Sequence, residues 1–155
     1  MMGAMEFASY ITGFTDGEGT FCVSFSRRTK LTTGIEVRPS FSVSQHKRNV
    51  RILERIQEYF KCGGIRFSKR DRCYKYEVRS IQDLVKHIIP HFEKYPLQTT
   101  KRADFEHFVS ICKLVVSNQH LNRDSLGAII EEAYQMNESG IRRYQKNELL
   151  QLLER

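Results

Sequence analysis

Residues 11–19 read Ile-Thr-Gly-Phe-Thr-Asp-Gly-Glu-Gly, and their glycine spacing is unusual for a helix. Apolar residues in and before this stretch recur at helical spacing, which predicts a short helix over residues 6–17. Gly13 and Gly17 are four residues apart and therefore share one face of that helix. An interior glycine costs about 1 kcal/mol relative to alanine. Two glycines on one face allow another backbone to approach closely, so the spacing favours a close helix–helix contact.

Two acidic residues end the same helix. Asp16 and Glu18 lie near its C-terminus, where the helix macrodipole disfavours negative charge, so local energetics do not explain them. Carboxylate oxygens at this point suit Mg²⁺, and a cation beside a phosphate-binding surface would serve metal-assisted phosphodiester cleavage. Asp-Gly and Glu-Gly are also ordinary turn pairs, so a glycine-rich turn with incidental acids stays open as the alternative.

After this helix the hydrophobic pattern changes to a period of two, which is typical of half-buried strands. The apolar positions are Phe21, Val23 and Phe25 in a first run and Val37, Phe41 and Val43 in a second, joined through Thr32, Thr33 and Gly34. We therefore expect two long antiparallel strands.

The remaining elements follow from the same two periodicities. We expect a helix at 50–60 that ends at Gly63 and Gly64, a hairpin over 65–79 that turns near Asp71 and Arg72, a helix from Ser80 to about Ile89, and helices at about 100–117, 124–136 and 141–154. Ser80 and Asp83 resemble a capping box, and Pro90 is expected to interrupt the helix that they open. The order α-β-β-α-β-β-α, followed by helices, predicts an α+β fold with an antiparallel sheet.

The chain has 155 residues, of which 40% are hydrophobic, and this suits one globular domain with its own core. We expect a single domain over 1–155, with a core at 6–120 and C-terminal helices at 121–155. The expected packing surface of those helices is formed by Leu126, Ile129, Ile130, Ala133 and Tyr134. No run reaches the roughly 18 apolar residues of a membrane span, and no secretory signal is expected. The four scattered cysteines favour reduced thiols over a zinc site or a disulfide scaffold.

The positive charge is concentrated in one block. The formal net charge is +7, but residues 27–80 hold 15 Lys and Arg against 5 Asp and Glu. The rest of the chain holds 10 basic and 13 acidic residues. A basic block inside a folded domain favours a polyanion as partner, and a surface kept basic for solubility is the alternative.

Each predicted strand has one apolar and one polar face, so one side of the sheet covers helices and the other faces water. The polar face is strongly basic, with seven Arg or Lys and one Glu. Its residues, which we expect to contact DNA or RNA, are Ser24, Ser26, Arg28, Lys30, Arg38, Ser40, Ser42, Arg66, Ser68, Arg70, Lys75, Glu77 and Arg79.

Three segments resemble one known family. Residues 11–19, the segment Phe41-Ser42-Val43-Ser44-Gln45, and the stretch from Tyr95-Pro96-Leu97 through Lys101-Arg102-Ala103-Asp104-Phe105 are similar to the LAGLIDADG homing endonucleases. With the order of elements, the resemblance covers about residues 6–120.

The resemblance implies the αββαββα fold of that family, with a saddle-shaped, antiparallel DNA-binding sheet. In the family the motif helix packs against a second copy across a two-fold or pseudo-two-fold axis. Because this sequence contains the motif once, the resemblance implies a homodimer and a roughly palindromic DNA target. The residues expected at the dimer interface are Tyr10, Gly13, Phe14 and Gly17.

The resemblance also implies roles at the active site. Glu18 matches the acidic residue that binds divalent metal near the scissile phosphates, and the carbonyl of Gly17 is expected to be a further ligand. Asp16 matches the earlier acid of the motif, which we assign mainly to the structure of the helix end. Gln45 matches a polar residue near the attacking water, and Lys101 is the candidate for the basic residue that supports the transition state.

One position departs from the family pattern. A basic side chain found in some members four residues after the glutamine aligns here with Asn49. Lys47, Arg48 and Arg51 are the possible substitutes, and the sequence does not choose among them.

The function implied is site-specific, metal-dependent cleavage of both strands of a long, near-palindromic DNA, leaving staggered ends. Mg²⁺ is the expected cofactor, with Mn²⁺ or Ca²⁺ as substitutes, Ca²⁺ without catalysis. The expected partners are double-stranded DNA and a second copy of the chain, with no membrane and no small-molecule substrate. The alternative is a non-cleaving protein, either an intron RNA maturase or a DNA-binding regulator. The location stays open among chloroplast, mitochondrion and prokaryotic cytoplasm.

Overall fold

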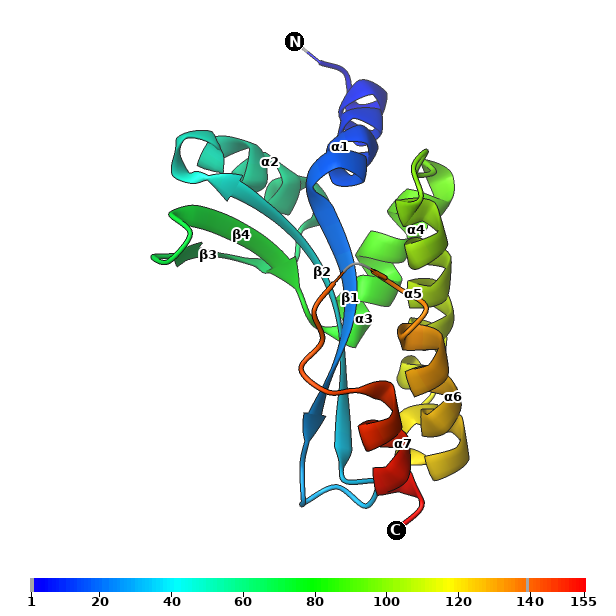
Figure 1. Cartoon of the computed structure of the whole chain (residues 1–155). Coiled ribbons are helices and arrows are strands. Elements are labelled where there is room, and N and C mark those ends of the chain that lie inside the picture. The colour runs from blue at the N-terminus through cyan, green and yellow to red at the C-terminus, as the bar shows by residue number, and fades with distance from the viewer. Residues whose placement is uncertain (1, 139) are drawn as a thin grey trace. The chain divides into compact units, whose positions relative to one another are not determined.

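The structure, a computed structural model, describes residues 2–138 and 140–155, and its elements follow the predicted order (Figure 1). In chain order they are α1 (Ala4–Glu18), β1 (Gly19–Arg27), β2 (Ile35–His46), η1 (Lys47–Asn49), α2 (Val50–Phe60), β3 (Gly64–Ser68), β4 (Cys73–Val78), α3 (Ile81–Asp83), η2 (Leu84–Ile88), α4 (Ile89–Lys94), α5 (Lys101–Val116), η3 (Gln119–Leu121), α6 (Arg123–Ala133) and α7 (Lys146–Leu153). The α+β fold class is therefore confirmed.

The four strands form one antiparallel sheet in the order β1-β2-β4-β3. Strand β4 lies between β2 and β3, with Val43 opposite Tyr76 on one side and Ile65 opposite Tyr76 on the other. The predicted alternation is confirmed, because Phe21, Val23 and Phe25 are buried while Ser24 between them is exposed.

The chain divides into two compact units. The first consists of Met1–Phe21 and Ser40–Arg102, and the second of Cys22–Pro39 and Ala103–Arg155. In the first unit, α1 runs directly into β1, and α2 packs along the β3–β4 hairpin (Figure 1).

Aromatic side chains form the core of the first unit. The Phe41 ring lies 5.2 Å from that of Phe21 and 5.5 Å from that of Phe92, and Phe60 stacks on Tyr76 at 6.4 Å. All five side chains are buried, and the Tyr76 hydroxyl donates a hydrogen bond to the Cys62 carbonyl. This cluster joins the motif segment to the sheet and to the helices that follow it.

The prediction that Pro90 interrupts a helix was wrong. Residues Leu84–Ile88 form a π-helical turn, in which the N–H of Ile89 donates to the Leu84 carbonyl, and the helix continues through Pro90 to Lys94. Proline lacks an N–H, and its ring clashes with the carbonyl four residues earlier. A widened turn directly before Pro90 relieves this conflict, so the helix is deformed and not ended.

The second unit contains the distal part of the β1–β2 ribbon and the C-terminal helices. α6 packs on α7, and Leu126, Ile129, Ile130 and Ala133 are fully buried, as predicted for a packing surface. Arg142, which the sequence did not single out, donates hydrogen bonds to the backbone carbonyls of Val23 and Ala133. It therefore fastens the segment after α6 to strand β1.

No helix in the part of the chain that the structure describes has the length and apolar character needed to cross a bilayer.

Candidate active site and nucleic-acid interface

The end of α1 carries the predicted metal ligand. Glu18 is the last residue of α1, and strand β1 begins at the next residue. Its side chain is exposed, and its carboxylate makes no hydrogen bond or ion pair with any other residue that the structure describes. Gly17 beside it is also exposed. The end of α1 thus exposes hard oxygen donors, those of Glu18 and Gly17, to solvent.

Asp16, two residues earlier, is hydrogen-bonded within the chain. Its carboxylate accepts hydrogen bonds from the N–H of Gln98 at 2.8 Å and from the N–H and hydroxyl of Thr99 at 3.2 and 2.7 Å. Partial burial raises the pKa of Asp16, but these hydrogen bonds and the nearby charge of Lys101 outweigh it and hold the pKa below its ordinary value. Asp16 therefore ties α1 to the segment before α5, which agrees with its assignment to the structure of the helix end.

Lys101 also contacts the motif helix. Its Nζ donates to the backbone carbonyls of Thr15 at 2.8 Å and Asp16 at 3.1 Å. These carbonyls belong to the last turn of α1, so the ammonium group satisfies acceptors at the negative end of the helix dipole. The structure brings Lys101 to the end of α1, where the carbonyls that it contacts lie two and three residues before Glu18.

The other candidate residues lie around the end of β2. Gln45 accepts a hydrogen bond from the side-chain amide of Asn49 at 3.3 Å. Arg48 is tied to His46 through the Nδ1 atom of that histidine, and Lys47 and Arg51 are exposed. Among Lys47, Arg48, Arg51 and Lys101, it is Lys101 for which a contact with the motif helix is observed.

One face of α1 is open. A Cβ atom added at Gly13 or Gly17 would meet no atom within 4 Å. Large apolar side chains stand exposed on the same helix, with Met5 at 73% and Tyr10 at 40% exposure. The Tyr10 ring also stacks between those of Phe7 and Phe14, at 6.0 and 5.8 Å. Among the described residues, the two glycines therefore pack against no other element, and they leave room for one.

A series of buried and partly buried hydrogen bonds, which the sequence did not predict, joins α1 to the residues packed against it. The Thr12 hydroxyl donates to the Tyr95 carbonyl at 2.9 Å, so its oxygen accepts from Nε2 of His91 at 3.1 Å. The Nδ1 atom of His91 then accepts from the Tyr59 hydroxyl at 2.9 Å. The imidazole is neutral in this arrangement, and burial lowers its pKa from 6.5 to about 4.

We expect this histidine to make folding stability depend on pH. His91 takes up a proton below about pH 6.5 in the unfolded chain, but only near pH 4 in the folded chain. The contribution of neutral His91 to folding stability is therefore complete above pH 6.5 and is lost as the pH falls toward 4. The free energy of unfolding should decline in that window by up to about 1.4 kcal/mol per pH unit. Denaturant titrations at fixed protein concentration measure it. The variant His91→Gln keeps one donor and one acceptor, so it should lose this slope; an unchanged slope would contradict the assignment.

The polar face of the sheet carries most of the predicted contact residues. In the register of β2 and β4, Ser42 lies opposite Glu77 and Ser44 opposite Lys75, and in that of β3 and β4, Arg66 lies opposite Lys75. Lys30 and Arg70 lie in the turns beyond the strands, and both are exposed. Ser42 is 8% exposed, so it is less accessible than predicted. Ser44 shares the face and is exposed, and the alternation that identified Ser40 and Ser42 could have identified it too.

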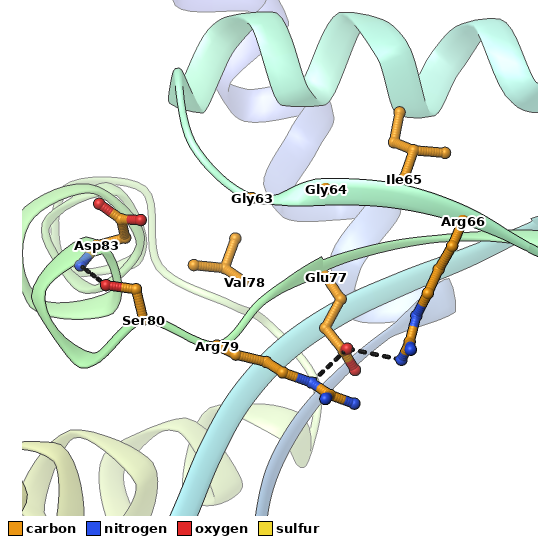
Figure 2. A pocket seen from close by; sticks show the side chains of 9 residues that line it. All are labelled: Gly63, Gly64, Ile65, Arg66, Glu77, Val78, Arg79, Ser80 and Asp83. Carbon is orange, nitrogen blue, oxygen red and sulfur yellow. Dashed lines mark hydrogen bonds and ion pairs between the residues drawn. The ribbon is translucent and has the colours of Figure 1, made fainter.

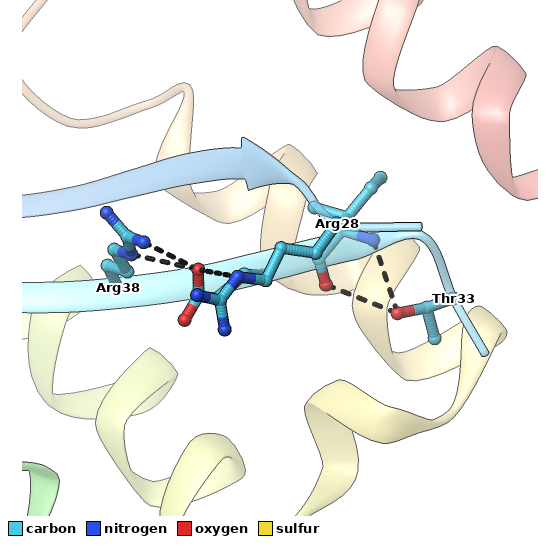
Figure 3. Close-up of polar contacts among 5 residues, drawn as sticks. Arg28, Thr33 and Arg38 are labelled. Carbon is cyan, nitrogen blue, oxygen red and sulfur yellow. Dashed lines mark hydrogen bonds and ion pairs between the residues drawn. The ribbon is translucent and has the colours of Figure 1, made fainter. Parts of the chain in front are cut away.

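Two carboxylates on this face gather the basic side chains. Glu36 forms ion pairs with Arg28 at 3.3 Å and Arg38 at 2.7 Å on the β1–β2 ribbon, where Figure 3 shows the two arginines. Glu77 pairs with three cations on the β3–β4 hairpin and directly after it. The predicted face had Glu77 as its one acidic residue, so Glu36 is a correction to that prediction, and the sequence did not predict the pairings of either carboxylate.

The geometry defines an α+β protein with a basic antiparallel sheet face and a helix that ends in exposed oxygen donors. The model of the family described as LAGLIDADG endonuclease matches residues 11–112. The chain belongs to the LAGLIDADG endonuclease family.

Relatives and solved structures agree with this assignment. A "Probable intron-encoded endonuclease 2" of Neurospora crassa is 35% identical over 83% of this chain and 29% of its own. The archaeal intron-encoded homing endonuclease I-Vdi141I, solved with DNA, is 29% identical with a TM-score of 0.88, over 96% of this chain and 94% of its own. I-SmaMI, bound to uncleaved DNA in the presence of calcium, is 30% identical with a TM-score of 0.85, over 96% of this chain and 49% of its own. The chain spans about a quarter to a third of the length of four curated relatives that it matches.

Proposed function

We propose that this chain is a site-specific homing endonuclease that cuts both strands of a long, near-palindromic DNA and leaves staggered ends. The observation that carries the proposal is the position of Glu18, an exposed carboxylate without a partner among the described residues, at the end of the helix whose glycine face is open. Strand β1 follows this helix directly and carries Ser24 and Ser26 of the polar sheet face, which is the surface that we propose binds phosphates.

The donor set fits a divalent metal ion. The Glu18 carboxylate and the Gly17 carbonyl are hard oxygen ligands, which suit Mg²⁺ and, as substitutes, Mn²⁺ or Ca²⁺. The described residues contain no group of three His, Cys, Asp or Glu that could hold a metal within one chain. A second motif helix that brings its own Glu18 would therefore complete the site. When bound, the metal supplies activation of water and stabilisation of the departing oxygen.

The neighbouring residues have supporting roles in this proposal. Lys101 holds the carbonyls at the end of α1 and adds positive charge beside the phosphate. Gln45, with its amide group at the end of β2, orients the attacking water. Asp16 keeps the helix end against the segment before α5.

The proposed assembly is a homodimer joined through α1. The open face at Gly13 and Gly17, with Tyr10 and Phe14 beside it, would receive the same face of a second copy. Each subunit would then cut one strand of a two-fold target.

The proposed DNA contacts are the basic and serine residues of the polar face. Arg and Lys suit phosphates and guanine edges, and small hydroxyl groups read donors and acceptors without bulk. Because several relatives are named intron-encoded, we propose that this chain is also encoded by an intron, in an organellar or a prokaryotic gene.

A cleavage selection tests the proposed function. The protein is incubated with a randomised, near-palindromic duplex library in Mg²⁺, and both the cut molecules and the bound molecules are sequenced. We expect one extended consensus with two-fold symmetry among the cut molecules, a similar result in Mn²⁺ and binding without cleavage in Ca²⁺. Selective binding without any cleavage in Mg²⁺ or Mn²⁺ would instead identify a binding protein.

A further inference from the structure

Glu77 lies in the middle of the polar face of the sheet and holds three cations. Its Oε1 atom is 2.9 Å from Nη2 of Arg66 and 2.6 Å from Nε of Arg79, and its Oε2 atom is 3.0 Å from Nζ of Lys75. The cations come from β3, from β4 and from the residue directly after β4. Figure 2 shows the Glu77 carboxylate between Arg66 and Arg79. One side chain thus organises the basic residues of the whole β3–β4 hairpin.

The neighbours of Glu77 in the sheet are small. Its register partners are Ser42 on β2 and Gly64 on β3, and a Cβ added at Gly64 would meet no atom within 4 Å. The Glu77 side chain is nevertheless only 9% exposed, whereas those of Arg66 and Arg79 are 61% and 60% exposed. The carboxylate is therefore covered while the guanidinium groups around it remain accessible.

The neighbouring cations favour the charged form of Glu77. Burial raises the pKa of its carboxyl group, but the charges of Lys75, Arg79 and Arg66 outweigh burial and hold the pKa below its ordinary value. The cluster therefore keeps one negative and three positive groups at neutral pH. Both carboxylate oxygens are occupied, which leaves Glu77 poorly placed to accept a hydrogen bond from a cytosine amino group.

The pairing also orients the arginines. Arg79 is bound through Nε, so both of its terminal nitrogens stay available on one edge of the guanidinium plane (Figure 2). Arg66 is bound through one terminal nitrogen, so its other donors stay available. A guanidinium edge with two free donors is what bidentate contact with guanine O6 and N7 requires. Because that edge is already oriented before binding, less side-chain entropy is lost when the DNA is recognised.

We propose that Glu77 is a positioning residue for sequence recognition, which holds Arg66, Lys75 and Arg79 in the orientation that reads one block of base pairs in each half-site. This inference rests on the proposed function, because it assumes that the polar face binds DNA. Glu77 acts through the three cations and does not itself contact a base.

Binding selections without cleavage test the role. Wild type, Glu77→Gln and Arg79→Lys are each equilibrated with the randomised duplex library in Ca²⁺, and the bound DNA is sequenced. Glu77→Gln removes the charge but keeps the shape, so we expect preference at one contiguous block in each half-site to fall by about tenfold, the scale of a lost bidentate contact. Arg79→Lys keeps the charge but loses the fork, and should weaken preference within the same block.

The matched control is Glu36→Gln, which adds the same charge to the β1–β2 ribbon. It should strengthen binding to random DNA at low salt as much as Glu77→Gln does. The base preference at the block that Glu77→Gln affects should stay as in the wild type. Thermal unfolding shows whether each variant folds. If Glu77→Gln does not fold, the base preference of Arg79→Lys is the measurement that tests the cluster. A wild-type protein that selects no sequence contradicts the proposed function. A wild-type preference that survives in folded Glu77→Gln, or equal and uniform changes in both glutamine variants, overturns the role of Glu77 alone.

Discussion

Glu18→Gln is expected to reduce DNA cleavage by at least about a thousandfold, equivalent to roughly 4 kcal/mol of transition-state stabilisation. The amide keeps the shape of the side chain but loses the negative charge that we propose holds a divalent cation. Target binding should stay within about tenfold of wild type, because most of the binding free energy comes from contacts of the sheet with phosphates and bases. Single-turnover cleavage in Mg²⁺ and binding in Ca²⁺ measure the two effects separately.

The matched control for this variant is Glu54→Gln, which makes the same change at an exposed position of α2. It should cut at nearly the wild-type rate. If Glu18→Gln still cleaves in Mg²⁺ at a rate near that of the control, Glu18 is not a metal ligand.

Gly13→Leu is expected to separate the subunits. Within one chain the new side chain has room, since a Cβ at Gly13 meets no atom within 4 Å, and leucine favours helix more than glycine does. Between two chains the same side chain would hold the helices apart. Sedimentation should therefore report about 18.2 kDa for the variant and twice that mass for the wild type, and cleavage of both strands should be lost.

Glu54→Leu controls for the added apolar surface, because it places leucine on an exposed face of α2. It should remain dimeric. A dimeric Gly13→Leu protein with wild-type cleavage would show that the subunits meet elsewhere, and a wild-type protein that is monomeric on its target while cutting both strands would exclude the homodimer.

Much of the fold was predictable because local patterns decide it. The alternation around Phe21 and Phe41 gave the strands and their buried face, and the apolar spacing of residues 50–60 predicted α2 with its observed bounds. Pro90 was misread, since the rule that proline ends a helix does not include the π-helical turn that accommodates it.

The candidate site was predictable in its residues and less so in their interactions. Glycine spacing and the misplaced acids singled out α1 and the pair Asp16 and Glu18 from local chemistry. The family resemblance then assigned the metal to Glu18 and supplied Lys101. The contacts of Asp16 with Gln98 and Thr99 join residues more than 80 positions apart, so no local pattern reveals them. The ion pairs of Glu77 likewise depend on the register between β3 and β4 and on the reach of long side chains.

We propose that the Glu18 carboxylates of two subunits together hold a cation over the DNA strands to be cut. The most direct measurement is anomalous diffraction from crystals of the protein with its selected DNA and Mn²⁺. This shared site should place manganese within coordination distance, roughly 2.0–2.3 Å, of a Glu18 oxygen from each subunit and beside a backbone phosphate. Manganese bound elsewhere, or two Glu18 side chains too far apart to share a site, would contradict it.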